Sequence, residues 1–151
     1  MRISNYINYL QHPEIDLSIA FKPVSKHHVP EPDVHEMCKL LASWSIGHAA
    51  NLATMVNRYG EADEKEPDRM SYSVLKLRTG SLGLLRDLHD LWLMANDVKL
   101  GWIILHQCSK ALRDEKLKLF CEQSGAETKR QIEWLMTKIK HSTSQILTVP
   151  A

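Results

Sequence analysis

The chain has 151 residues, with 19 basic and 18 acidic side chains and a formal net charge of +1. This length suits a single domain, and the near-zero net charge gives no field that favours nucleic acid or an anionic membrane. No apolar run reaches the roughly 18 residues of a membrane span, and the first residues lack the apolar stretch of a secretion signal. The three cysteines, Cys38, Cys108 and Cys121, have no Cys-x-x-Cys spacing. These features predict a soluble protein of the cytoplasm.

Residues 1–30 show no sustained hydrophobic period. Pro13, Pro23 and Pro30 interrupt the segment, although apolar side chains are too frequent for a typical disordered tail. We therefore expect an ordered N-terminal arm over residues 1–30, with one helical turn near residues 7–10, packed on the bundle or on a partner subunit. A disordered leader is the alternative. Residues 31–151 then form the helical bundle domain.

The first long helix is expected over residues 33–60. Pro32 ends the preceding segment, Asp33 can cap free amides, and Gly60 is a natural terminator. Its apolar seam alternates steps of four and three along Val34, Cys38, Leu41, Ser45, His48, Leu52, Met55 and Tyr59. A charged connection follows, and then a shorter helix over about residues 68–79, which Gly80 and Gly83 separate from the next helix.

A second long helix is expected over residues 84–112 and a third over residues 114–147. The seam of the first of these runs through Leu84, Leu88, Leu91, Ala95, Val98, Trp102, Leu105, Ser109 and Leu112. The turn at residues 112–114 is so short that the two helices must form an antiparallel hairpin. The predicted fold class is all-α, an antiparallel four-helix bundle with an N-terminal arm.

Three segments give the chain a likeness to a known family. They are Leu84–Leu91 (LLRDLHDL), Ala111–Leu117 (ALRDEKL) and Glu127–Leu135 (ETKRQIEWL). Together with helix number and length, they resemble the hairpin of bacterial stress-associated proteins of the ferritin-like superfamily. That resemblance implies a four-helix bundle over roughly residues 33–147, often dimeric and frequently with a di-iron centre bridged by carboxylates.

The chain departs from that family in its metal ligands. Di-iron members supply one Glu from each of two helices and a Glu-x-x-His pair from each of the other two. This sequence contains no Glu-x-x-His, and no Asp or Glu lies between Met37 and Asn57. We therefore expect no di-iron centre and no cofactor, and we transfer neither ferroxidase nor oxygenase activity.

His48 is the most informative single position, because it falls on the apolar seam in the middle of its helix. A buried imidazole needs a hydrogen-bond partner, and Gln131 and Thr128 on the core face of the last helix are the candidates. A metal or small-ligand site built on these three residues is the alternative interpretation.

Two further groups of residues are candidates for function. Asp87, His89 and Asp90 form an acidic and imidazole cluster, a weak candidate for a ligand site because positions i, i+2 and i+3 do not converge on a helix surface. Trp92 and Leu85 widen the apolar stripe of their helix beyond the needs of one hairpin, and Trp44 is a further apolar anchor. These three residues predict a dimer interface.

Three hypotheses for function follow. The first is a non-catalytic ferritin-like bundle, a homodimer with an interaction or stress-associated role and no nucleic-acid or membrane partner. The second is a bundle that binds a metal or small ligand through His48. The third is a regulatory or signalling adaptor, for which His106 has an imperfect phosphotransfer context.

Overall fold

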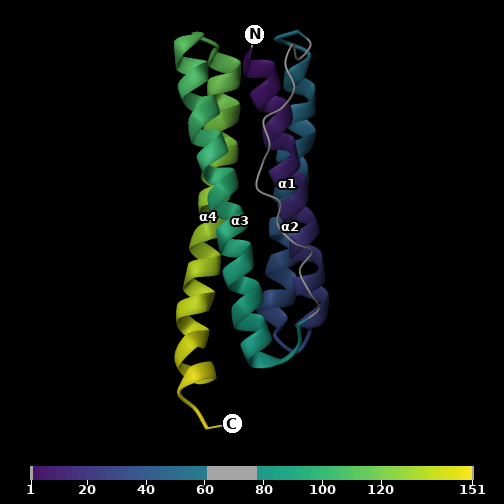
Figure 1. Ribbon diagram of the computed structural model, residues 1–151, viewed down its shortest axis with the longest axis vertical. Helices are drawn as coiled ribbons and strands as arrows, with labels where there is room; N and C mark the ends of the chain where they lie inside the picture. Colours follow the sequence, from purple (N-terminus) through teal and green to yellow (C-terminus); the bar gives the residue numbers. More distant parts are fainter. Residues whose placement is uncertain (1, 61–77, 151) are drawn as a thin grey trace.

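The computed structural model describes residues 2–60 and 78–150. These residues form four α-helices and no strand (Figure 1): α1 (Arg2–His27), α2 (Pro32–Val56), α3 (Gly80–Ala111) and α4 (Glu115–Leu147). The all-α class is thus confirmed. The shorter helix expected over residues 68–79 falls almost entirely outside the described part of the chain. None of the four described helices combines the length and apolarity needed to cross a membrane.

The expected N-terminal arm is wrong, because residues 2–27 form a full helix of the bundle. Pro13 and Pro23 lie inside α1, where each removes a backbone hydrogen bond at a cost of about 3 kcal/mol. Burial of one continuous face of the helix opposes this cost, since tertiary packing overrides local propensity. The fully buried side chains of this face include Ile7, Leu10, Leu17 and Phe21.

The other helices differ from expectation only at their ends. α2 stops at Val56 rather than near Gly60, and α3 begins at Gly80 rather than after Gly83. Gly80 has φ +78°, a conformation that suits glycine, and both glycines fall in the first turn, whose amides lack helical partners in any case. Asp114 caps α4, since its Oδ1 accepts a hydrogen bond from the Leu117 amide at 3.1 Å.

The predicted seams of the long helices face the core. In α3, every predicted seam residue from Leu84 to Ser109 is buried, and only Leu112, which lies beyond the end of the helix, is exposed. In α2, the seam is buried from Val34 to Met55.

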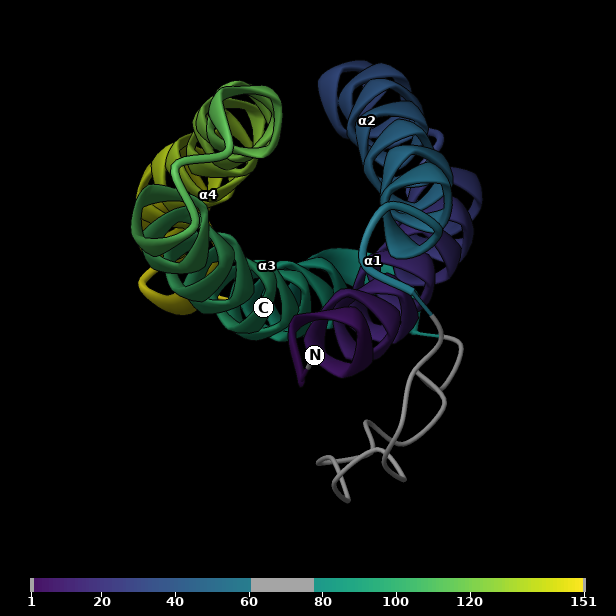
Figure 2. The same ribbon diagram turned by 90° about the horizontal axis from the view of Figure 1, so that it is seen from above.

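The helices follow the order α2, α1, α3, α4 around an open ring when viewed from above (Figure 2). α1 packs along α2, α3 packs along α4, and α1 joins the two pairs through α3. At the α1–α3 contact, a Cβ on Gly101 would lie 2.3 Å from Leu10 Cδ1, so glycine permits the close approach. α2 and α4 touch at few points, and the side chains that link them are largely polar.

A pair of leucine substitutions tests the assignment of the core. Leu91→Ala should lower the free energy of unfolding by about 2–5 kcal/mol, because Leu91 is fully buried and the change leaves a cavity. The matched change Leu119→Ala, at an exposed position of α4, should alter it by no more than about 0.5 kcal/mol. Urea denaturation followed by circular dichroism measures both values. Equal effects would contradict the assigned faces.

Candidate functional site

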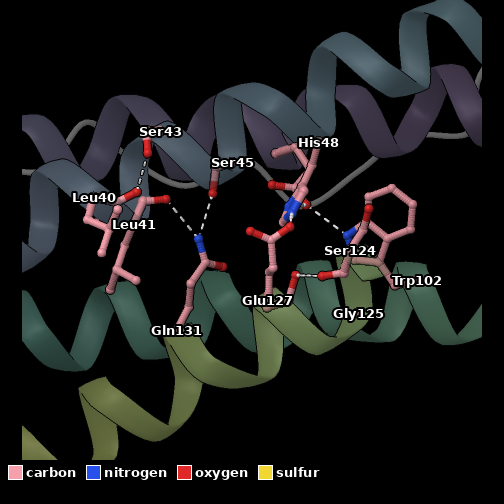
Figure 3. A network of polar contacts seen from close by, with 12 residues as sticks. Leu40, Leu41, Ser43, Ser45, His48, Trp102, Ser124, Gly125, Glu127 and Gln131 are labelled. Atoms are coloured by element: carbon pink, nitrogen blue, oxygen red, sulfur yellow. Dashed lines mark hydrogen bonds and ion pairs between the residues drawn. The ribbon is translucent and has the colours of Figure 1, made fainter. Parts of the chain in front are cut away.

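At one level of the bundle, all four helices contribute a polar side chain to the same network (Figure 3). His48 of α2 lies between two carboxylates, with Nδ1 3.0 Å from Oε1 of Glu14 in α1 and Nε2 3.4 Å from Oε1 of Glu127 in α4. Trp102 of α3 donates its indole N–H to the same Glu14 oxygen at 2.8 Å. Glu14 is therefore the point at which α1, α2 and α3 meet through directional contacts.

Burial and the neighbouring negative charges shift the pKa of His48 in opposite directions. Glu14 is 0% exposed and His48 is 3% exposed, whereas Glu127 lies nearer the surface. Burial alone would lower the pKa of His48, but the hydrogen bonds and negative charges of Glu14 and Glu127 outweigh it and raise the pKa above the ordinary value of 6.5. The protonated imidazole can donate one N–H to each carboxylate, which is the arrangement that best satisfies a buried histidine between two acids.

Trp102 donates a hydrogen bond to the network and also covers one side of it with an apolar ring. Its indole stands nearly edge-on to the His48 ring, with centroids 5.8 Å apart and planes at 77°. Phe120 packs against the indole in a similar edge-to-face manner, with centroids 5.2 Å apart. The aromatic rings keep the imidazole away from water, and this strengthens its hydrogen bonds to the carboxylates.

The partners predicted for His48 are not the ones that the structure shows. Gln131 donates from Nε2 to the Leu41 carbonyl and to Ser45 Oγ, each at 2.9 Å, and Thr128 donates to the Ser124 carbonyl within its own helix. Both residues are buried as expected, but Glu127 is the residue of α4 that reaches His48.

Glu14 was missed because its segment was interpreted as an arm. Leu10, Glu14, Leu17 and Phe21 follow the same steps of four and three as the other seams. This spacing was the available signal, and it places an acidic residue on an apolar face.

The predicted cluster of Asp87, His89 and Asp90 divides in the structure. Arg78 bridges the two aspartates, with Nη1 2.8 Å from Asp87 Oδ1 and 2.7 Å from Asp90 Oδ2. Asp87 is buried and also lies 2.7 Å from Nε2 of His28, which is likewise buried. His89 is exposed and contacts only the nearby Arg86 in the contacts described. The carboxylates are therefore engaged by Arg78 and His28 rather than by His89.

The residues at the centre of the bundle do not fit a di-iron centre. Such a site takes four glutamates and two histidines, whereas this level provides Glu14, His48 and Glu127. Both nitrogens of His48 are occupied by carboxylates. Within residues 2–60 and 78–150, no group of three or more His, Cys, Asp or Glu side chains is placed to hold a metal ion. From Met37 to Val56, which includes the level of His48, α2 carries no Asp or Glu that could bridge two cations.

The three residues predicted for a dimer interface do not lie together. Leu85 and Trp92 line a groove between α3 and α4, whereas Trp44 belongs to α2, whose backbone does not pack against α3 in the described residues. His106, the residue considered for phosphotransfer, is partly exposed, with Nε2 3.2 Å from Oε1 of Glu122.

The fold and the network define an all-α protein of four described helices with a histidine–carboxylate core. Comparison with protein-family models, with curated proteins and with solved structures finds no match in any of the three.

The raised pKa of His48 predicts a specific pH dependence of stability. A raised pKa in the folded state stabilises the protein fully below the unfolded value of about 6.5, and this contribution is lost as the pH rises through the folded pKa. The free energy of unfolding of wild type should therefore fall above about pH 6.5, and His48→Gln should flatten this part of the profile. Urea denaturation across the pH range measures it.

His141→Gln, at an exposed position of α4, is the matched control and should keep the wild-type profile. If His48→Gln does not fold, Glu127→Gln provides a milder test, because it removes one of the two anions and should reduce the slope. Parallel profiles for wild type and Glu127→Gln would contradict the role of the network.

Proposed function

We propose that this protein is a non-catalytic bundle of ferritin-like type that acts by interaction with other protein surfaces, beginning with a second copy of itself. The observation that carries this proposal is an apolar stripe on the outer face of α3, which consists of Leu93, Leu100, Ile103 and Ile104. The four side chains are between 37% and 56% exposed.

Residue pairings support an antiparallel, ferritin-like arrangement. Between α1 and α2, contacts join Ser25 to His35 and Glu14 to His48. Residue numbers therefore decrease along one helix as they increase along the other, as in an antiparallel pair. Between α3 and α4, Lys99 contacts Gly125 and His106 contacts Glu122 in the same sense.

The position of the polar network supports the proposed absence of a di-iron centre. Ferritin-like bundles hold their metal between facing helices with inward-pointing side chains. Here the side chain that α3 contributes is the bulky Trp102, and the histidine at this level, His48, already lies between two carboxylates. The histidine at this level is thus already engaged by carboxylates, and this favours the outer surface as the place of function.

Iron binding separates this proposal from the alternative of a metal site at His48. Wild type and His48→Ala should both show no saturable binding of ferrous iron by calorimetry under argon, because the network lacks the bridging carboxylates that two cations require. Elemental analysis of protein purified without chelators should give equal, sub-stoichiometric metal for both. Stoichiometric iron in wild type that is lost in His48→Ala would establish the alternative.

The stripe on α3 is suited to pairing with itself. Leu93 and Leu100 lie seven residues apart and flank residues 96–97. A two-fold axis crossing the helix at that point would place Leu93 of one copy on Leu100 of the other, with Ile104 extending the contact. Symmetric pairing of equal apolar surfaces is the commonest form of homo-oligomer, and a seven-residue leucine spacing is typical of helix pairs.

Oligomeric state tests this surface. Wild type should be dimeric at micromolar concentration in sedimentation equilibrium, and Leu100→Glu should be monomeric, because it buries an unpaired charge in the interface. Leu40→Glu, at a leucine of α2 that is 44% exposed, is the matched control and should remain dimeric. Monomeric wild type, or equal association of all three proteins, would count against the proposal.

We also propose that the protein resides in the cytoplasm. Cys38, Cys108 and Cys121 are all free thiols, and Cys38 and Cys121 are buried. Burial raises the pKa of each of these two thiols to about 12, so they remain protonated and unreactive at neutral pH. Such cysteines suit the reducing cytoplasm.

A further inference from the structure

A groove of about 440 Å³ runs along the outside of the bundle between the first half of α3 and the last third of α4. Its volume lies within the range of small-molecule sites, about 300–1,000 Å³. The lining residues are Leu82, Leu85, Arg86, His89 and Trp92 from α3, and Met136, Ile139 and Thr143 from α4. It lies nearer the start of α3 than the stripe at residues 93–104, and so it is a separate surface.

The chemistry of the groove is divided between an apolar lining and a cationic edge. Five of its side chains are apolar, and Arg86 is the one permanently charged residue among them. Arg86 is half exposed, with Nη1 3.1 Å from His89 Nδ1 and Nη2 3.0 Å from Asp90 Oδ1. A guanidinium has five N–H donors, so these contacts leave donors for another acceptor.

Arg86 shares its carboxylate partner, Asp90, with a second arginine. Asp90 also accepts a hydrogen bond from Arg78 at 2.7 Å, so one carboxylate is shared between two guanidinium groups. Asp87, which also engages Arg78, is buried on the core side of α3 and lies beside His28. An anion at the edge of the groove would therefore find a half-exposed arginine with N–H donors to spare.

Trp92 contributes its ring, and not its polar atom, to the groove wall. Its indole N–H is shielded from solvent and has no acceptor among the described residues. Because this N–H is shielded, a ligand in the groove would contact the indole ring and take its hydrogen bonds from Arg86.

We propose that this groove binds a small amphipathic carboxylate, with its apolar body between Leu85, Trp92 and Ile139 and its carboxylate on Arg86. The size of the groove, its apolar lining and its single arginine favour this class over a neutral apolar ligand. Two other occupants compete with it: a helix of a second copy, and the exposed Leu147 and Val149 that follow the same end of α4.

Calorimetric titration with octanoate and with octanol as probes tests the proposal on wild type. Octanoate should bind saturably, with one site per chain, and more tightly than octanol. Arg86→Gln should weaken octanoate binding about tenfold or more, because it removes a charge-assisted hydrogen bond, and should leave octanol unchanged. Arg130→Gln, at an exposed arginine of α4 that does not line the groove, is the matched control.

Variants that fill the groove with a larger side chain test whether the probes bind there. Ile139→Trp should abolish binding of both probes, and Leu85→Trp is the second variant should the first fail to fold by circular dichroism. Absence of saturable octanoate binding, equal affinity for octanol, or unchanged binding in the folded filled variant would each overturn the proposal.

The same titration separates this site from the proposed self-association. Leu100→Glu lies outside the groove and should bind octanoate as wild type does, whatever its oligomeric state. Binding seen only in Leu100→Glu would assign the groove to a second copy, and binding seen only after removal of residues 147–151 would assign it to the C-terminal residues. Either result overturns the carboxylate proposal without deciding whether the chain dimerises.

Discussion

The carboxylate of Glu14 is the constraint on which the interior of this bundle depends. An ionised carboxylate removed from water is unfavourable by several kcal/mol unless other groups satisfy it. Here a histidine of α2 and an indole N–H of α3 converge on one of its oxygens. Apolar seams tolerate small shifts of one helix along another, whereas directional contacts do not. Glu14 therefore fixes the positions of α1, α2 and α3 along the bundle axis relative to one another.

The same network also links α4 to α2. The other adjacent pairs of helices pack closely along their lengths, but α2 and α4 meet through separated polar contacts. His48 reaches Glu127, Gln131 reaches the Leu41 carbonyl and Ser45, and Lys138 lies 2.7 Å from Asp33. This seam carries more charge than the rest of the core, so its stability should respond to pH and salt more than the apolar seams do.

The sequence predicted the parts of the fold that rest on sustained periodicity. α2, α3 and α4 follow steps of four and three over several turns, and their buried faces agree with that pattern. α1 was not predicted, because Pro13 and Pro23 are strong local signals against a helix, and the packing that overrides them is not visible in local sequence. The missed helix also affected the prediction of the functional site. His48 was placed correctly in the core, but its principal partner, Glu14, lies on the helix that was interpreted as an arm.

The two faces of α3 differ, because one packs in the core and the other lies on the surface. Toward the interior, this helix carries an unbroken apolar seam and the indole that bonds to Glu14. Away from it, the helix presents first the groove with Arg86 and then the stripe from Leu93 to Ile104, and no described helix covers either surface. Because α3 lies between α1 and α4 and packs against both, its backbone is held from two sides. A surface that is ordered before it binds loses little conformational entropy on binding, and this favours the outer face of α3 as the recognition surface that we propose.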